Sequence, residues 1–237
     1  MTQPVFFKSA EELAGTAGKQ WIEELRRRKG TGGAYLVALS GGRIAKQFFS
    51  AVAGEARAEK AVFDAVHFFW GDERCVPPDN QESNFRLAKE LLFEPLGIAE
   101  SRTHRIRGEL NPEIAAAQAE RDLRAIAPVD NNTQPVFDLI FLGMGEDGHV
   151  ASLFPGELEE VVASKAVYRA VVATKPPPQR ITLGYPCLAA ANQIWVLASG
   201  TGKENALRAS LTPTGTTPLA RVLHKNVHTK VFTEIQL

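Results

Sequence analysis

One loop of the sequence places an aspartate and a histidine together in a setting that suits proton transfer. Residues 137–156 have the sequence FDLIFLGMGEDGHVASLFPG, and the apolar run 137–142 is typical of a strand that is buried on both faces. Asp147 and His149 follow in the loop after that run. A histidine is the usual general base near neutral pH, and a carboxylate can fix its tautomer. We therefore expect His149 to act as a base that Asp147 orients, with a histidine merely exposed to water as the alternative.

Three other loops with reactive residue types follow apolar runs at 34–39, 65–70 and 193–198. These loops hold Ser40-Gly41-Gly42, Gly71-Asp72-Glu73-Arg74, and the segment 199–203 that ends in Lys203. The carboxyl ends of parallel strands lie at one edge of a sheet, where open α/β sheets bind their ligands. We therefore expect these loops and the Asp147–His149 loop to converge on one cleft.

Glycines in two of these loops favour a phosphate site. Gly41 and Gly42 precede a predicted helix over 43–53, and backbone N–H groups at the start of a helix can bind a phosphate. A plain tight turn is the alternative. Lys203 can add a point charge to the same phosphate, although its loop is not a P-loop because a glutamate replaces the Ser or Thr of that motif. Arg180 can bind an anion through two parallel hydrogen bonds, with an ordinary surface arginine as the alternative.

The run 143–148 matches the G-x-G-x-x-G pattern of dinucleotide-binding loops. Two features argue against that interpretation. Glu146 and Asp147 place negative charge where a pyrophosphate would bind, and no acidic residue ends the next predicted strand, 166–173, to hold a ribose. We therefore expect that this loop does not bind a dinucleotide.

Two further chemistries find little support in the sequence. A metal ion could be held by His149 together with Asp147, Glu146 and Asp72, but no second histidine lies nearby in the sequence, so we expect no metal. A conventional serine hydrolase is disfavoured because the sequence has no G-x-S-x-G motif.

Predicted strands alternate with predicted helices along the chain. Besides the four strands above, we expect strands at 166–173 and 227–232, a short one at 103–106, and helices at 9–29, 84–92 and 111–124. This alternation is typical of an α/β fold with a parallel or mostly parallel sheet. With 237 residues, we expect residues 1–237 to form a single α/β domain.

The composition limits the partners. Lys plus Arg and Asp plus Glu both number 27, which argues against a nucleic-acid partner or an anionic membrane surface. No apolar run approaches the ~20 residues that span a bilayer, and the start of the chain lacks the pattern of a signal peptide. Cys75 and Cys187 are far apart and match no paired metal spacing. We therefore expect a cytoplasmic protein with reduced thiols.

The motifs together resemble those of 6-phosphogluconolactonases. The resemblance rests on the runs FWGDERCVP at 69–77, Ser83-Asn84, GMGEDGHVASLFPG at 143–156, RITL at 180–183 and SGTGK at 199–203, in this order. It implies hydrolysis of 6-phosphoglucono-δ-lactone to 6-phosphogluconate in the oxidative pentose phosphate pathway, without metal or cofactor. It also implies a three-layer α/β/α sandwich similar to that of glucosamine-6-phosphate deaminases and ribose-5-phosphate isomerases.

The deaminases are the close competitor, because they share the Gly-Gly loop, the Asp-Glu pair and the Asp-Gly-His loop. They typically have an asparagine-glutamate-proline-glycine run after the histidine, where this chain has Leu153-Phe154-Pro155-Gly156. The missing glutamate favours the lactonase. A catalytically silent sugar-phosphate sensor on the same fold is a third alternative, which the Asp147–His149 pair disfavours.

The resemblance also implies roles for individual residues. We expect His149 and Asp147 to activate water, Arg74 to stabilise the oxyanion, and Asp72 to contact sugar hydroxyls or to orient Arg74. The remaining candidates are expected to bind the phosphorylated substrate or, for Ser83 and Asn84, also to brace the Asp72 loop: Ser40, Gly41, Gly42, Arg43, Ser83, Asn84, Gly145, Arg180 and Lys203. Many members have Ser-Thr-Pro after the two glycines, whereas this chain has Arg43-Ile44-Ala45, so Arg43 is a candidate replacement for the lost hydroxyls. The expected partner is a small sugar-phosphate lactone, and the expected state is a monomer or a weak homo-oligomer.

Overall fold

Apolar runs of the sequence pair into a parallel sheet of six strands. The computed structural model describes residues 3–30 and 32–237. The strand order is β1 (Val5–Phe6), β9 (Thr229–Thr233), β8 (Ile194–Ala198), β5 (Leu139–Gly143), β2 (Tyr35–Leu39) and β3 (Val66–Trp70), and all neighbours run parallel. Every residue of β2 and of β8 is buried. Strands covered on both faces need no polar alternation, which explains their continuous apolar sequences.

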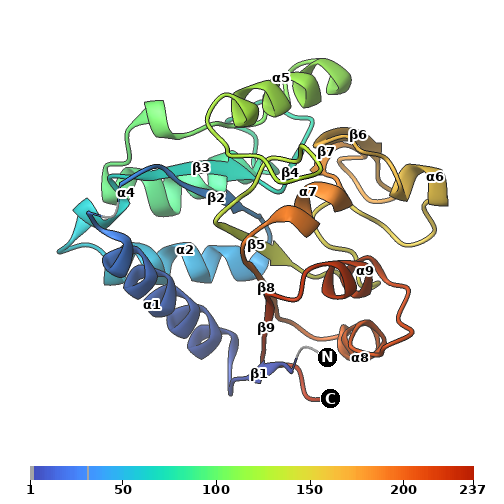
Figure 1. The fold of residues 1–237 in the computed structure, drawn as a ribbon. Coiled ribbons are helices and arrows are strands. Elements are labelled where there is room, and N and C mark those ends of the chain that lie inside the picture. The colour runs from blue at the N-terminus through green and yellow to red at the C-terminus, as the bar shows by residue number, and fades with distance from the viewer. Residues whose placement is uncertain (1–2, 31) are drawn as a thin grey trace.

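Helices cover both faces of this sheet and complete three layers (Figure 1). On one side lie α1 (Ala10–Arg28) and α2 (Arg43–Glu55), which pack against each other. On the other side lie α7 (Tyr185–Ala190), α8 (Glu204–Ser210) and α9 (Pro218–Lys225). The expected α/β/α architecture with a mostly parallel sheet is therefore confirmed.

The first helix begins where the sequence predicted. The Ser9 hydroxyl accepts a hydrogen bond from the backbone N–H of Glu12 at 3.1 Å. The Glu12 carboxylate accepts from the N–H of Lys8 at 2.7 Å, one residue before the position of the standard capping box.

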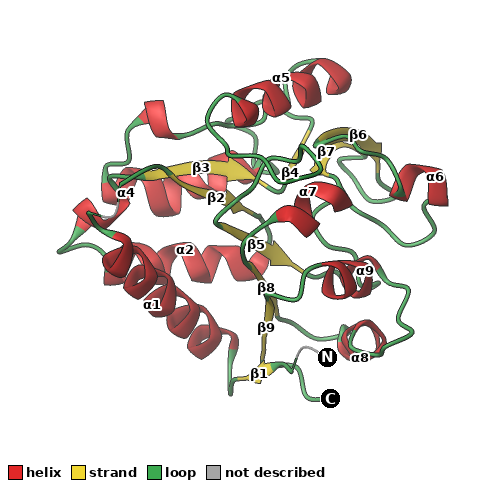
Figure 2. Cartoon of the chain, viewed as in Figure 1, coloured by secondary structure: helices red, strands yellow, loops and turns green. Residues whose placement is uncertain are grey.

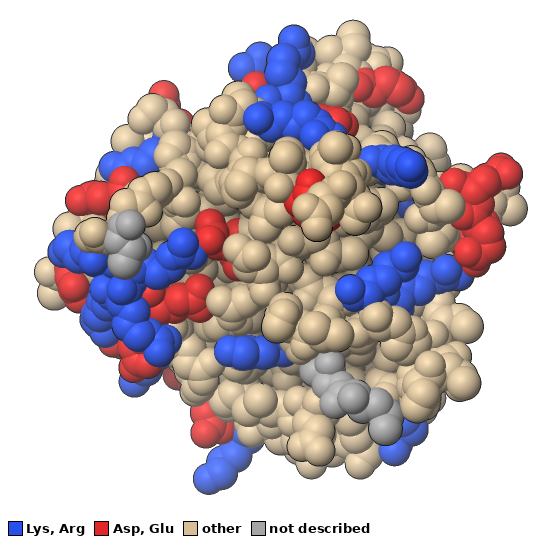
Figure 3. Space-filling model, viewed as in Figure 1, with Lys and Arg blue, Asp and Glu red and all other residues tan. Residues whose placement is uncertain are grey.

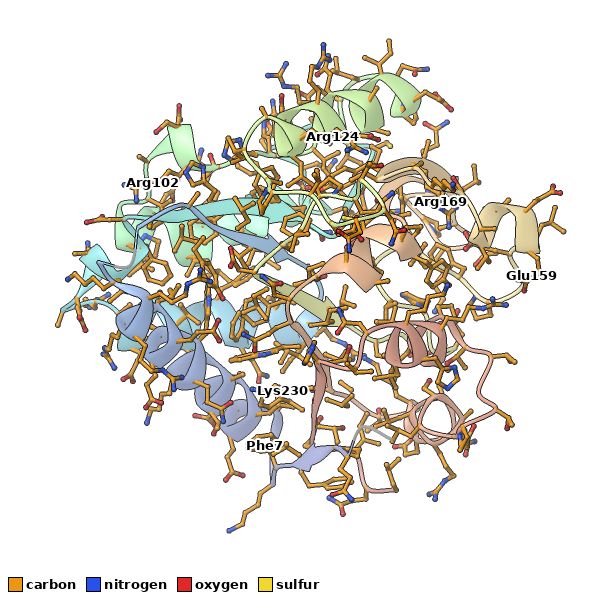
Figure 4. All side chains as sticks on the ribbon, in the orientation of Figure 1. Phe7, Arg102, Arg124, Glu159, Arg169 and Lys230 are labelled. Atoms are coloured by element: carbon orange, nitrogen blue, oxygen red, sulfur yellow. The ribbon has the colours of Figure 1, made fainter. Side chains whose placement is uncertain are left out.

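Aromatic rings hold the first helical layer against the sheet. Trp21 of α1 is fully buried, and its ring centroid lies 5.1 Å from that of Phe141 on β5 and 6.0 Å from that of Phe48 on α2. Truncation of a buried aromatic costs about 3–5 kcal/mol of stability. Since β5 leads directly into the loop of Asp147 and His149, this packing fixes the base of that loop. Towards the β1 edge of the sheet, Phe7 stacks on Phe232 and Lys230 lies over Trp195. Figure 4 labels Phe7 and Lys230.

A second, smaller sheet is antiparallel and was not predicted. Its order is β4 (Asp72–Arg74), β7 (Gln179–Leu183) and β6 (Tyr168–Val172), and α5 (Pro112–Arg124) packs against it. The segment 72–74, expected as a loop, is thus a strand. All three of its residues are charged, which masks the usual strand pattern: Asp72 and Arg74 line the cavity described below, and Glu73 is buried against α3.

Gly71 joins the two sheets. Its N–H donates to the carbonyl of Leu39 on β2 at 2.8 Å, and its carbonyl accepts from the N–H of Leu183 on β7 at 2.8 Å. The hydroxyl of Tyr168 on β6 donates to the carbonyl of Trp70 on β3 at 2.8 Å. One glycine therefore belongs to the hydrogen-bond networks of both sheets.

Short elements complete the chain (Figure 2). The predicted helix 84–92 consists of α3 (Asn84–Ala88), a π-helical turn (Lys89–Phe93) and α4 (Glu94–Leu96). Others are α6 (Glu159–Val162) and 3₁₀ turns at Lys60–Phe63 and Glu100–Arg102. The strand expected at 103–106 was wrong: only Thr103 forms a bridge, to Phe68.

On the face shown in Figure 3, Lys and Arg side chains are interspersed with Asp and Glu side chains. Among the described residues, no helix is both long enough and apolar enough to cross a membrane.

Candidate active site

The polar loops converge on a cavity of about 140 Å³ at the carboxyl ends of β2, β5 and β8. Most of the residues predicted from the sequence line this cavity: Ser40, Gly41, Gly42, Arg43, Asp72, Arg74, Asn84, His149, Arg180 and Lys203. It is also lined by residues that the sequence did not single out: Ile44, Gly143, Met144, Ala151 and Ser199. Asp147, Ser83 and Gly145 are absent from its wall. Asp147 and Gly145 contact His149, and Ser83 precedes Asn84 in the chain.

His149 and Asp147 form a hydrogen-bonded pair at the cavity. His149 Nδ1 lies 2.6 Å from Asp147 Oδ1, and the backbone N–H of His149 donates to the same oxygen at 3.1 Å. Partial burial acts to raise the pKa of Asp147, but the hydrogen bonds from His149 outweigh it and hold that pKa below its ordinary value. In a neutral imidazole that donates its Nδ1 proton to an ionised Asp147, Nε2 is the unprotonated nitrogen. In the described part of the chain Nε2 has no hydrogen-bond partner, which leaves it available to a ligand.

Gly145 lies directly against the imidazole ring of His149. The N–H of Gly145 donates to the carbonyl of His149 at 2.9 Å, which closes the loop on itself. A Cβ added to Gly145 would lie only 2.0 Å from the His149 ring. The sequence placed Gly145 among the substrate-binding residues, whereas the structure places it under the base. Phe154 packs against the same ring, with centroids 4.9 Å apart.

The Ser40-Gly41-Gly42 loop leads into α2. Gly42 occupies the position before the helix with a φ of 95°, a conformation that favours glycine, and no described side chain caps the helix. Its first N–H groups are therefore open to an anion. The Ser40 hydroxyl donates to the carbonyl of Phe141 at 2.8 Å, so its proton is already used within the fold.

Two cations lie beside this loop. A Cβ built on Gly200 would lie 3.5 Å from Arg43 Nη2 and 3.9 Å from Lys203 Cε. Lys203 Nζ donates to the carbonyl of Met144 at 2.6 Å. Burial lowers the pKa of Lys203, and the neighbouring charge of Arg43 lowers it further. An anionic ligand placed between the two cations would relieve that repulsion.

A second pair of cations comes from the small sheet. Arg74 on β4 and Arg180 on β7 are opposite each other in the strand register. Burial, followed by the charge of Arg74, lowers the pKa of Arg180. Arg74 Nη1 donates to the carbonyl of Glu82 at 2.7 Å, while its buried Nε has no partner among residues 3–30 and 32–237. With these four cations, the cavity suits a ligand of high negative charge.

Asp72 is held by a serine that the sequence analysis missed. Asp72 is 5% exposed, and its Oδ2 accepts from the hydroxyl of the fully buried Ser152 at 2.7 Å. The N–H of Ser152 donates to Thr182 Oγ1 at 3.1 Å. The signal available in the sequence was a lone hydroxyl residue within the apolar run 150–154.

Ser83 is the capping residue before α3 and does not line the cavity. It is 4% exposed, and its hydroxyl accepts from the N–H of Arg86 at 3.2 Å as the helix cap. Within the described residues, no group of three or more His, Cys, Asp or Glu side chains is placed to hold a metal ion.

Comparison with known proteins gives a consistent result. Residues 8–232 match the family model described as glucosamine-6-phosphate isomerases/6-phosphogluconolactonase. A 6-phosphogluconolactonase of Mycobacterium tuberculosis is 32% identical over 209 residues, which cover 86% of this chain and 84% of the relative. A 6-phosphogluconolactonase structure from Trypanosoma cruzi superposes with a TM-score of 0.84 at 25% identity and covers 99% of this chain and 95% of the other.

The fold extends beyond lactonases. A monomeric glucosamine-6-phosphate deaminase superposes with a TM-score of 0.81 at 18% identity, covering 98% of this chain and 96% of the other. At that identity the likeness concerns the fold alone, and it confirms the expected similarity to the deaminases.

Proposed function

The chain belongs to the glucosamine-6-phosphate isomerase/6-phosphogluconolactonase family, and from this membership we propose that it hydrolyses 6-phospho-D-glucono-1,5-lactone to 6-phospho-D-gluconate, a step of the oxidative pentose phosphate pathway. The relatives from M. tuberculosis and T. cruzi carry the name of that activity. The observation that carries the proposal is the His149–Asp147 pair, with its open Nε2, at a cavity lined by four cations. A deaminase is disfavoured because Phe154 stands where that branch typically has its glutamate.

The substrate phosphate binds at the start of α2 in this proposal. Its oxygens accept from the open N–H groups after Gly42, and Arg43, Lys203 and Arg180 supply the charge. The hydroxyl-bearing residues that many lactonases have after the two glycines are replaced here, and the guanidinium of Arg43 takes their place. Binding the remote phosphate orients the lactone, which can contribute several kcal/mol towards a reactive geometry.

Water attacks the lactone carbonyl with His149 as the base. Nε2 removes a proton from water as its oxygen bonds to C1, and Asp147 stabilises the imidazolium that forms. The C1–O5 bond then breaks, and Nε2 returns the proton to O5. The product acid releases its own proton to solvent, so each turnover consumes one water.

Arg74 stabilises the negative charge on the carbonyl oxygen. Its side chain lines the cavity, so the positive charge of its guanidinium is available to a developing oxyanion. Asp72 accepts a hydrogen bond from Ser152, and we assign it to a sugar hydroxyl or to the orientation of Arg74.

The proposed reaction uses only these side chains and needs neither a metal ion nor a cofactor. We also propose that residues 1–237 form one domain, since Gly71 and Tyr168 bond the small sheet to the large one. A cytoplasmic location, a monomer or weak homo-oligomer, and the lack of a nucleic-acid partner stay predictions from the sequence.

The test is a coupled assay of 6-phosphogluconate formation above the spontaneous hydrolysis of the lactone. His149→Ala is expected to lower kcat by about 10²–10⁴-fold, the usual contribution of a general base. Binding of 6-phosphogluconate is expected to persist. His224→Ala, at an exposed histidine of α9, is the matched control and should keep wild-type turnover.

Near-normal turnover in His149→Ala contradicts the assignment of the base. If the wild-type protein does not raise the rate of lactone hydrolysis above the spontaneous rate, the proposed function itself is contradicted. Ammonia release from glucosamine 6-phosphate would instead identify a deaminase.

A further inference from the structure

Glu73 is a buried acidic residue that has no role in the proposed mechanism. It lies on β4 between Asp72 and Arg74 and is 2% exposed. Its Oε1 accepts from the backbone N–H groups of Arg74 and Asn84, each at 2.8 Å. Its Oε2 accepts from the N–H of Phe85 at 2.8 Å and from the Ser83 hydroxyl at 3.2 Å.

This carboxylate joins a strand to the start of a helix. Asn84 and Phe85 are the first residues of α3, and their N–H groups have no acceptor within the helix. A carboxylate at that position is also favoured by the helix dipole. Loss of the acceptor would leave several buried donors unpaired, at about 1–3 kcal/mol each. The bonds therefore fix α3 firmly relative to β4.

The first residue of that helix reaches two parts of the site. The side-chain amide of Asn84 donates to the carbonyl of Asp72 at 2.9 Å and lies 3.4 Å from Asp72 Oδ1. Its Oδ1 covers Gly41 so closely that a Cβ on that glycine would lie 1.8 Å away. The side-chain amide of Asn84 thus contacts both Asp72, which lines the cavity, and the Gly41 loop, where the phosphate is proposed to bind.

We propose that Glu73 is a positioning residue: it sets the place of Asn84, and through Asn84 the separation of Asp72 from the phosphate loop. Glu73 touches no substrate in this arrangement. The kinetic part of this inference rests on the proposed lactonase function. A residue that only stabilised the fold would affect the folded fraction of the enzyme and leave the kinetics of folded molecules unchanged.

The test compares Glu73→Gln with Asn226→Ala. Glutamine keeps the shape of Glu73 but turns an NH₂ group towards N–H donors. Asn226 is 3% exposed, and its amide donates to the carbonyl of Ala191 at 2.7 Å, away from the cavity, so its loss is a matched destabilisation. Glu73→Asp, which keeps the charge on a shorter chain, serves if the glutamine variant does not fold.

Measured at pH 8, above the pKa of about 7 that burial gives Glu73, and well below the unfolding temperature, Glu73→Gln is expected to lower kcat/KM at least tenfold, whereas Asn226→Ala stays within twofold of wild type. Amide hydrogen exchange at Asn84 and Phe85 should accelerate in the first variant alone. A folded Glu73→Gln protein with kcat/KM within twofold of wild type overturns the inference, whatever its stability.

Titration with inorganic phosphate gives a readout that does not depend on lactonase activity. The affinity for phosphate is expected to fall severalfold in Glu73→Gln and to stay unchanged in Asn226→Ala. If the wild type binds phosphate but does not hydrolyse the lactone, the proposed function fails while this comparison still decides the role of Glu73. Equal phosphate affinity together with equal exchange rates refutes that role.

Discussion

The ammonium group of Lys203 contacts the loop that carries His149 and also lies at the proposed phosphate site. Its Nζ donates to the carbonyl of Met144, the residue that follows β5, and it lies beside Arg43 at the proposed phosphate site. An ammonium has three N–H donors, so two are left for an anion. A phosphate held there is connected through one nitrogen to the loop that carries His149.

Replacing Lys203 with Met keeps the apolar stem and removes the charge. Because a hydrogen bond to a charged group contributes about 1.5–3 kcal/mol, we expect KM for the phosphorylated lactone to rise about tenfold or more. The lost bond to Met144 should lower kcat as well. With glucono-1,5-lactone, which has no phosphate, kcat should fall similarly while KM changes little.

Lys175→Met is the control, at a lysine whose side chain is 75% exposed. Steady-state kinetics on both lactones separate the two roles of Lys203. An unchanged KM for the phosphorylated lactone would remove Lys203 from the phosphate site.

At the scale of single residues, the sequence identified groups whose partners are near in the chain. Asp147 and His149 are two positions apart, so a motif reveals the pair. Ser152 bonds to Asp72 across 80 positions, and Glu73 bonds to Asn84 across 11. Contacts of that kind depend on how the strands are placed, so the types of the residues could not predict them.

The loop between β5 and α6 is shaped by the backbone as much as by its charged residues. Gly145 meets the imidazole directly, and Ala151 on the cavity wall has a φ of 50°, which is uncommon for a residue with a side chain. Backbone strain of this kind is concentrated at functional sites. The loop must hold a half-buried base without the support of regular secondary structure.

Gly145→Ala should therefore inactivate the enzyme without unfolding it. The new methyl group displaces the His149 ring, which can turn aside at little cost to the fold. A misplacement of about 1 Å can cost 10²-fold in rate, and we expect a loss of kcat of that order. Turnover and the melting temperature are measured together. Gly15→Ala, where the added carbon meets no atom within 4 Å, is the control. Normal turnover in Gly145→Ala would mean that the ring position does not limit catalysis.

At the scale of elements, prediction succeeded where burial on both faces leaves an apolar run. The strands β2, β3, β5, β8 and β9 were predicted to within about two residues of their observed ends. The strands β4 and β7 were missed because their polar side chains, among them Asp72, Arg74 and Arg180, line the cavity. The polar residues that line the cavity are thus the ones that interrupt the apolar pattern by which a strand is predicted.

The free energy of unfolding of the whole molecule should depend on pH because of one buried acid, Glu73. Burial raises the pKa of Glu73 to about 7, against the opposing effect of its three backbone N–H donors, and the charge of Asp72 raises it further. Between about pH 4.5 and 7 the folded protein therefore holds a proton that the unfolded chain has released. The resulting contribution to stability is complete below pH 4.5 and is lost as the pH rises through 7.

Denaturant unfolding from pH 4.5 to 8 measures this contribution when wild type is compared with Glu73→Gln, which has no titrating group at this position. The free energy of unfolding of wild type should fall relative to the variant by up to about 1.4 kcal/mol per pH unit below pH 7, then level off. A difference that stays constant across this range would show that Glu73 titrates in the folded protein as it does in the unfolded chain.

Gly71 has a consequence for the timing of catalysis. Its N–H is bonded to the large sheet and its carbonyl to the small one, so the walls that carry the phosphate loop and the paired arginines meet at a fixed joint. Many enzymes close a lid or a domain over the substrate, and that motion often sets the rate of turnover. Here the two hydrogen bonds of Gly71 join the walls without a ligand. In the proposed reaction we therefore expect hydrolysis or product release, and not closure of one wall on the other, to limit turnover.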